Sequence, residues 1–288
     1  MKFPFTIFDL RFTIWRKSAE SAVFNRQSSI INRQFRSAFT LVEMLVVITI
    51  LGILAALTVP ALKSLGKSDA AVSASRQMLE GVGRARQLAI ANHTTVYMIF
   101  VTTNFWNGLS AAQLAMPATV NLCDKQLSGY TYVAYGGAGD QPGQHAWHYL
   151  EPWQSLPDGT FIASWKFAPR AQSVTVPNFS STVPIYGFMN APVPFPTVDS
   201  APVAVPCIAF NYLGQLTLDG QNPAGQDEYI PLARGSVFAA KDQTTKALQF
   251  SPADVSETPS GNSTSSAYNL VDIDWLTGRA TLIFQKVQ

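Results

Sequence analysis

An apolar run of twenty-four residues, from Phe39 to Leu62, constrains the fold of this chain more than any other feature. It reads FTLVEMLVVITILGILAALTVPAL, and Glu43 is its only charged residue. A helix of this length rises roughly 36 Å, more than the roughly 30 Å hydrocarbon core of a bilayer. Because Arg33 and Arg36 stand just before it, the sequence predicts a single membrane span with residues 1–38 in the cytoplasm and the C-terminal part outside.

Two residues in the run distinguish it from an ordinary membrane anchor. An ionised Glu43 in hydrocarbon costs several kcal/mol unless a cation meets it, so its presence indicates a partner. Pro60 removes a backbone hydrogen bond and favours a bend or a local opening of the helix. An ordinary signal peptide, cut after residues 59–61, is the alternative that these two residues argue against.

The segment AFTLVE at positions 38–43, with the apolar run and Pro60, resembles the N-terminal cleavage and methylation motif of type IV prepilins and type II secretion pseudopilins. The resemblance implies that a prepilin peptidase cuts between Ala38 and Phe39 and that the new N-terminus at Phe39 is methylated. It also implies that Glu43 meets this amine as subunits assemble. Ala38 stands where most of the family has glycine, and the leader is longer than is usual.

The expected domain organisation follows from these features. Residues 1–38 are a leader removed by prepilin peptidase, 39–62 the membrane part of a long helix, 63–92 its amphipathic continuation and 93–288 a β-rich extracytoplasmic domain. The helix end RARQLAIA (84–91) and the segments FNYLGQL (210–216) and LTGRA (276–280) resemble the FimT/GspH group of minor pilins and pseudopilins. The predicted fold class is therefore α+β and pilin-like, with the helix packed on an antiparallel sheet.

Apolar residues beyond Pro60 recur at helical spacing, first as Leu65, Val72 and Leu79, then as Met78, Val82, Ala85 and Ala89. This pattern predicts an amphipathic helix that ends near Asn92, a residue that tolerates the left-handed conformation.

Strands are predicted at 94–101, 129–135, 160–167 and 206–211, because these segments are rich in β-branched and aromatic residues. Hairpins are predicted at 209–218, turning near Gly214, and at 270–284, turning at 277–278. The proline-rich stretch 183–206 and the Ser/Thr-rich stretch 256–266 are expected to be surface loops.

The basic residues are concentrated in the leader. Residues 1–38 contain seven Lys/Arg and two acidic residues, whereas the rest of the chain has thirteen basic and sixteen acidic residues. Cleavage would thus leave a mature chain of net charge about −3, which gives no reason to expect a nucleic acid partner.

The cysteines and histidines leave alternatives open. Cys123 and Cys207 could form one disulfide if the domain is exported, or stay as two buried thiols. His145 and His148 are a close pair, with Asp140 and Glu151 nearby, and are either metal ligands or part of an aromatic, polar loop. We favour the loop.

Carboxylates alternate on the second hairpin, where Asp272 and Asp274 face away from Val271, Ile273 and Trp275. They could be catalytic or calcium ligands, but alternating acids on a hairpin are usually its solvated face. No nucleophile elbow, zinc-protease motif, phosphate loop or dinucleotide fingerprint occurs in a suitable context. The sequence therefore predicts no enzyme and no cofactor.

These features together favour a filament subunit, a minor pilin or pseudopilin of a type IV pilus or a type II secretion pseudopilus. The implied partners are the prepilin peptidase and methyltransferase, other pilin-like subunits, the inner-membrane assembly platform and membrane lipid. The implied location is the inner membrane, with the C-terminal domain in the periplasm or in an extracellular filament. The alternative is a membrane-anchored extracytoplasmic binding module or enzyme that uses only the export signal, with ligand recognition in residues 104–275.

Overall fold

The computed structural model describes residues 40–137, 139–141, 145–175, 184–264 and 269–283, with the backbone alone for 57–69 and 174–175. It divides into two units, Met1–Leu54 and Ala55–Gln288, which are described separately. The helical segments are α1 (Leu41–Asn92), α2 (Ala111–Leu114), α3 (Pro117–Leu122) and the 3₁₀ turns η1 (Cys123–Lys125) and η2 (Ser164–Phe167). The first strands are β1 (Val96–Phe100), β2 (Gly129–Tyr135), β3 (Trp147–Tyr149), β4 (Gln154–Ser155), β5 (Thr160–Ile162), β6 (Ser173–Thr175) and β7 (Pro184–Tyr186). The later strands are β8 (Met189–Pro194), β9 (Pro202–Phe210), β10 (Leu216–Thr217), β11 (Glu228–Phe238), β12 (Asp254–Glu257), β13 (Asn269–Ile273) and β14 (Ala280–Ile283).

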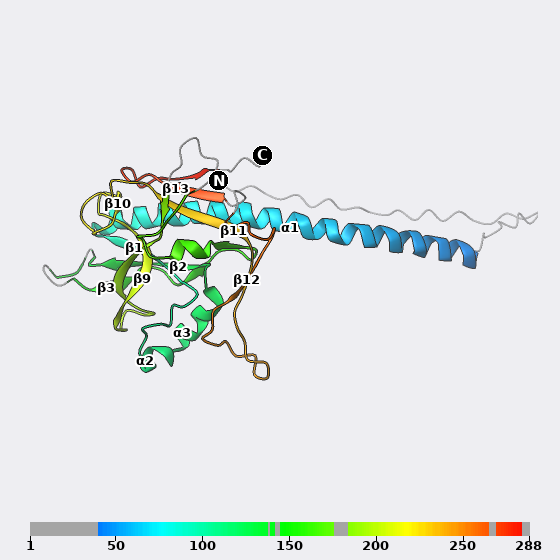
Figure 1. Ribbon diagram of the computed structural model, residues 1–288, viewed down its shortest axis with the longest axis horizontal. Coiled ribbons are helices and arrows are strands. Elements are labelled where there is room, and N and C mark those ends of the chain that lie inside the picture. The colour runs from blue at the N-terminus through cyan, green and yellow to red at the C-terminus, as the bar shows by residue number, and fades with distance from the viewer. Residues whose placement is uncertain (1–39, 138, 142–144, 176–183, 265–268, 284–288) are drawn as a thin grey trace, which may run out of the picture. The chain divides into compact units, whose positions relative to one another are not determined.

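The strands of the second unit form antiparallel sheets (Figure 1). The larger sheet has the order β10-β9-β1-β2-β3, with β4 paired to β2 and β8 to β9. A second sheet has the order β12-β11-β13-β14, with β5 paired to β11, and β6 pairs with β7 separately. A helix at the N-terminus followed by antiparallel sheets confirms the α+β fold class.

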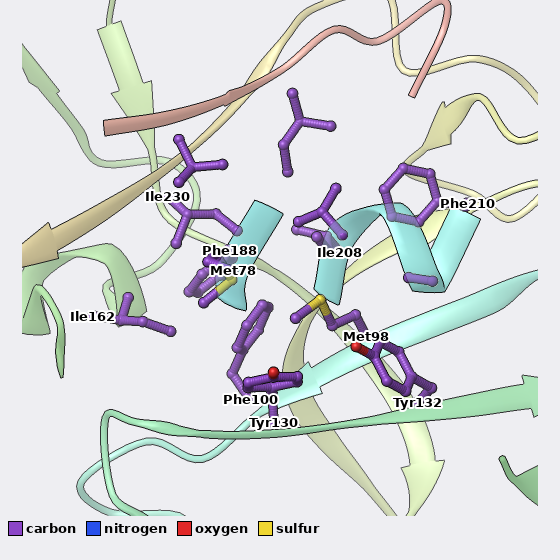
Figure 2. Packing of buried hydrophobic residues seen from close by; sticks show 14 of the residues in the cluster. Met78, Met98, Phe100, Tyr130, Tyr132, Ile162, Phe188, Ile208, Phe210 and Ile230 are labelled. Atoms are coloured by element: carbon purple, nitrogen blue, oxygen red, sulfur yellow. The ribbon is translucent and has the colours of Figure 1, made fainter. Parts of the chain in front are cut away.

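The outer part of α1 packs against both larger sheets through small and apolar residues at three-to-four spacing. The buried side chains on this face are Ala71, Ala74, Ser75, Met78, Val82, Ala85 and Ala89. Figure 2 shows Met78 among the side chains that reach the same core from the strands, including Phe100, Ile208 and Ile230. This burial confirms the predicted seam from Met78 to Ala89.

Val72 does not belong to the buried seam and is 47% exposed, which corrects the predicted seven-residue series. Successive residues of an α-helix lie about 100° apart around its axis, so Val72 points about 100° away from its buried neighbour Ala71 and off the face that the sheets cover. Leu79 is partly buried at the margin of the core. The side chain of Leu65 is not among those that the structure describes.

The helix ends at Asn92, as predicted, but the left-handed residue is His93, with φ of 49°. The side chain of Asn92 instead turns back to donate to the carbonyl oxygen of Leu88 at 2.9 Å. The main-chain N–H of Thr94 donates to the carbonyl oxygen of Ala89 at 3.3 Å. These bonds satisfy carbonyls of the last turn and send the chain directly into β1.

One strand prediction and one loop prediction are wrong in part. The predicted strand 160–167 is a strand only over β5, and the rest is the 3₁₀ turn η2, which directs the side chain of Lys166 into the core. The predicted loop 183–206 contains β7, β8 and the start of β9 in its described residues. Prolines are accommodated in β8 because, among the strands that the structure describes, β8 pairs only with β9 and so lies at a sheet edge.

The hairpin predictions are confirmed within the described residues. β9 and β10 pair around a turn with Gly214 at φ of 79°, and β13 and β14 pair around Gly278 at φ of 63°. The predicted loop 256–266 is corrected at its start, because residues 256–257 belong to β12, which pairs with β11.

Candidate functional site

Thr40 and Glu43 form a capping box at the start of α1. The main-chain N–H of Glu43 donates to Thr40 Oγ1 at 3.2 Å, and Glu43 Oε2 accepts from the main-chain N–H and hydroxyl of Thr40 at 3.1 and 3.0 Å. Because the first N–H groups of a helix have no intrahelical acceptor, this reciprocal pair stabilises the helix start. The signal is visible in the sequence as Thr-x-x-Glu before an apolar run, but our sequence prediction considered Glu43 only as a partner for a cation.

The other predicted processing residues are less well placed. Ala38 and Phe39 lie outside the described residues, so cleavage and methylation there stay predictions. The backbone of α1 remains helical through Pro60, whose side chain is not described. A functional bend at Pro60 likewise stays a prediction.

Large apolar side chains are exposed around the whole of the first part of α1. Between Leu41 and Leu54 their exposed fractions run from 44% for Val47 to 82% for Leu41. These side chains are Leu41, Val42, Met44, Leu45, Val46, Val47, Ile48, Ile50, Leu51, Ile53 and Leu54. A helix that is apolar on all sides is normally covered by protein or lipid, so this surface indicates an interaction site.

Within the described residues, no helix has the length and apolarity needed to cross a membrane.

The outer part of α1 contacts the larger sheet through polar bonds as well as through its apolar seam. Tyr132 donates its hydroxyl to the carbonyl oxygen of Gly81 at 3.1 Å, and Gln77 donates to the hydroxyl of Tyr130 at 3.0 Å. A Cβ on Gly81 would lie 3.2 Å from Tyr132 Oη. The absence of a side chain there lets the helix approach the sheet closely.

The two hairpin turns meet each other and the helix near its end. Arg86 donates from Nε to the carbonyl oxygen of Thr277 at 2.7 Å. A Cβ on Gly278 would lie 2.1 Å from the carbonyl oxygen of Gly214, and a Cβ on Gly214 would lie 2.7 Å from Ile90 Cδ1. The structure thus brings together the three segments on which the FimT/GspH resemblance depends.

A buried ion pair, which sequence analysis missed, joins η2 to β11. Lys166 is fully buried and donates from Nζ to Glu228 Oε1 and, at 2.6 Å, to the carbonyl oxygen of Tyr186. Arg170 donates to the other carboxylate oxygen of Glu228 at 2.8 Å. Burial lowers the pKa of Lys166, whereas Glu228 opposes that shift. No sequence motif marks this pair, because its members are far apart in the chain.

The histidines that were considered as metal ligands have different partners in the structure. His148 Nε2 contacts Asp140 at 3.1 Å, and the hydrogen bond with His148 lowers the pKa of Asp140. His145 packs on the ring of Tyr135, with ring centroids 5.5 Å apart. Glu151 is engaged elsewhere, since it accepts from Arg84 Nε at 2.7 Å. Among the described residues, no group of three or more acidic, histidine or cysteine side chains could hold a metal ion.

Cys123 and Cys207 are free, buried thiols in the structure and belong to one apolar cluster. Cys123 begins η1, whereas Cys207 lies in the middle of β9. Burial raises the pKa of both thiols, so neither is poised as a nucleophile. A bridge between them stays a prediction for the exported protein.

Asp272 departs from the predicted solvated face of its hairpin, whereas Asp274 follows it. Asp274 is exposed and accepts from the main-chain N–H of Thr277 at 2.6 Å. Asp272 is half-buried, and its Oδ1 has no hydrogen-bond partner among the described residues. Burial, reinforced by the charges of Asp227 and Asp274, raises the pKa of Asp272 to about 6.

Residues 33–59 match the model of the prokaryotic N-terminal methylation motif. The match includes the predicted scissile bond, Thr40 and Glu43, and ends one residue before Pro60. It supports a type IV pilin-like or pseudopilin protein. Comparison with curated proteins and with solved structures found no match. The FimT/GspH resemblance and the particular filament therefore stay predictions.

Proposed function

We propose that this chain is a minor pilin or pseudopilin, a structural subunit of a type IV pilus or a type II secretion pseudopilus. A prepilin peptidase cuts between Ala38 and Phe39, and the new N-terminus is methylated. Residues 39–62 then anchor the subunit in the inner membrane, with residues 93–288 in the periplasm or on the filament. The proposal gives the chain no enzymatic activity and no cofactor.

The observation that carries the proposal is the uncovered apolar surface of α1 between Leu41 and Leu54. Removing one such side chain from water contributes about 1.5 to 3 kcal/mol, so the eleven together strongly favour a covering of lipid or of other helices over water. Lipid covers this surface before assembly, and the equivalent helices of neighbouring subunits cover it afterwards. The inner-membrane platform transfers the subunit from one environment to the other.

Glu43 has two successive roles in this proposal. In the precursor its carboxylate caps α1 through Thr40. Cleavage creates a cationic amine at Phe39, next to this cap, and the carboxylate of Glu43 in a neighbouring subunit neutralises it. This pairing sets the register between helices as the subunit enters the filament.

Three variants separate the charge of Glu43 from its capping bond. Glu43→Gln keeps a capping box, because glutamine also serves at this position, but removes the charge. Thr40→Val keeps the charge and removes the cap, and Glu43→Ala removes both. We expect all three to insert into the membrane and be processed, while Glu43→Gln and Glu43→Ala fail to enter filaments and Thr40→Val enters them.

The measurement is the fraction of subunit recovered in sheared filaments or in cross-linked complexes with other pilin-like subunits. N-terminal sequencing of the mature chain accompanies it, because Phe39 at the N-terminus excludes an ordinary signal peptide. Wild-type recovery of Glu43→Gln in filaments would refute the charge-pairing role. A mature N-terminus beyond Ala61 would refute the filament proposal itself.

A further inference from the structure

A cavity of about 400 Å³ lies beside the start of β11, and its lining includes Tyr186, Asp227, Tyr229 and Trp275. The three aromatic side chains come from different parts of the chain, namely from β7, from β11 and from the turn after β13. All three are partly buried, so each keeps an accessible surface. A cavity of this size is within the range of small-molecule sites in proteins.

Two contacts hold the walls of the cavity. The main-chain N–H of Trp275 donates to Asp227 Oδ1 at 2.9 Å. The guanidinium of Arg170 lies 5.9 Å from the centre of the Tyr186 ring, close enough for a cation–π contact. One ring of the cavity thus already contacts a cation of the protein.

One carboxylate, that of Asp227, lines the cavity, and a second lies close to its Tyr229 wall. Asp272 lies directly opposite Tyr229 in the pairing of β11 with β13. Its Oδ1 is buried and has no hydrogen-bond partner among the described residues. Within the same described part of the chain, no basic side chain forms a salt bridge with Asp227, Asp272 or Asp274.

The raised pKa of Tyr229 indicates that the carboxylates of Asp272 and Asp227 act on this wall of the cavity. Burial raises the pKa of Tyr229 to about 12, and the charges of Asp272 and Asp227 add to the shift. Both carboxylates therefore act on the phenol that lines the cavity. A cation in the cavity would interact with the same carboxylates and with the faces of the rings.

The arrangement does not suit a metal ion, because in the described residues no three such ligands converge on one point. Aromatic side chains with carboxylates close by instead suit a cation whose charge is spread over alkyl groups. We propose that this cavity binds a small organic ammonium ion of the trimethylammonium class. The site is separate from the N-terminal motif, so the proposal does not depend on the filament function.

The test uses the full chain in non-ionic detergent at fixed ionic strength, with binding measured by titration calorimetry. The probes are tetramethylammonium, choline and 3,3-dimethylbutanol, the uncharged isostere of choline. We expect choline to bind at least about tenfold more tightly than the isostere, which corresponds to about 1.4 kcal/mol. Absence of choline binding, or equal binding of the two, would overturn the proposal.

A fourth probe, glycerophosphocholine, presents the same head group with its phosphate, as a lipid does. Because the carboxylate of Asp227 lines the cavity and Asp272 lies opposite Tyr229, we expect the phosphate to weaken binding relative to choline. Tighter binding of glycerophosphocholine than of choline would contradict a site for the free cation.

Matched variants locate the site. Asp227→Asn keeps an oxygen to accept from the N–H of Trp275 but removes the charge, and we expect it to weaken choline binding at least threefold. Tyr229→Leu should weaken binding, whereas Tyr229→Phe should retain it within about twofold. Asp199→Asn removes an exposed carboxylate that does not line the cavity and should leave choline binding unchanged. If all these folded variants bind choline with nearly the same affinity, the cation binds elsewhere and the proposal is refuted.

Discussion

Arg86 in α1 donates a hydrogen bond from Nε to the carbonyl oxygen of Thr277, 191 positions later in the chain, at 2.7 Å. This bond fixes the turn of the second hairpin against the helix, and Gly278 follows it with φ of 63°. The turn of the first hairpin lies against the same point, because Gly214 O is within 2.1 Å of where a Cβ on Gly278 would be. The end of the helix is thus held against two turns, and the close approach of these turns requires glycine at position 278.

Gly278→Ala should therefore destabilise the protein strongly. The left-handed conformation costs an alanine about 1 to 2 kcal/mol, and the contact with Gly214 O requires the turn to move as well. We expect a loss of about 2 to 5 kcal/mol in the free energy of unfolding, measured by denaturant titration.

Gly83→Ala is the control for this substitution. Gly83 lies in α1, and a Cβ there would meet nothing within 4 Å. Alanine should stabilise the helix by about 0.5 to 1 kcal/mol. If both variants shift stability in the same direction, the close packing of the two turns does not hold the helix end.

The pair of Lys166 and Glu228 should respond unequally to removal of its members. Glu228→Gln leaves a fully buried ammonium with the carbonyl of Tyr186 and no carboxylate, which should cost about 3 to 5 kcal/mol. Lys166→Met leaves Glu228 paired with Arg170, so its cost should be roughly half as large or less. Thermal and denaturant unfolding of both variants measures the difference. Equal losses would mean that Arg170 does not compensate the charge of Glu228.

The reactivity of the cysteines distinguishes two states of the exported protein. Because Cys123 and Cys207 are buried and their pKa values are raised, neither should react with iodoacetamide in the native state. If they are free thiols, both should become alkylated on unfolding without a reductant. If a bridge forms, alkylation should require reduction, as intact-mass measurement would show. Rapid alkylation of native protein would contradict the burial of the thiols.

Sequence analysis predicted the elements whose signals are local. The seam from Met78 to Ala89, the end of α1 and the two glycine turns depend on residues close together in the chain, so spacing was sufficient. It failed for Val72, because the sheets, and not the helix alone, decide which face is covered. It failed for β8, because only the sheet topology shows that its prolines lie at an edge.

The candidate site was predictable to a similar extent. The charge of Glu43 in an apolar run was evident, and its capping bond to Thr40 follows from a known motif. The pair of Lys166 and Glu228 was not predictable, since it depends on a long-range contact between η2 and β11. The same is true of the cavity near Tyr229, whose walls come from three distant segments.

Asp272 should make the stability of the protein depend on pH between about 4 and 6. Its pKa is raised from 3.8 to about 6 in the folded state, so the folded protein binds more protons than the unfolded chain in this range. Stability from this group is therefore fully present below the unfolded pKa and is lost as the pH rises through 6. Since Asp272 is only half-buried, solvent screening limits the effect to about 1 kcal/mol.

Asp272→Asn removes this titration, and its comparison with wild type isolates the contribution of one carboxyl group. We expect the variant to be as stable as wild type near pH 4 and more stable at pH 7, because asparagine keeps the shape without the charge. Urea titrations at both pH values measure the difference. Asp274→Asn is the matched control: hydrogen bonds with Thr277 lower the pKa of Asp274, so its replacement should reduce stability at pH 7. A stabilising effect of both substitutions at pH 7 would point to general charge repulsion on the hairpin, and no effect of Asp272→Asn would refute the raised pKa.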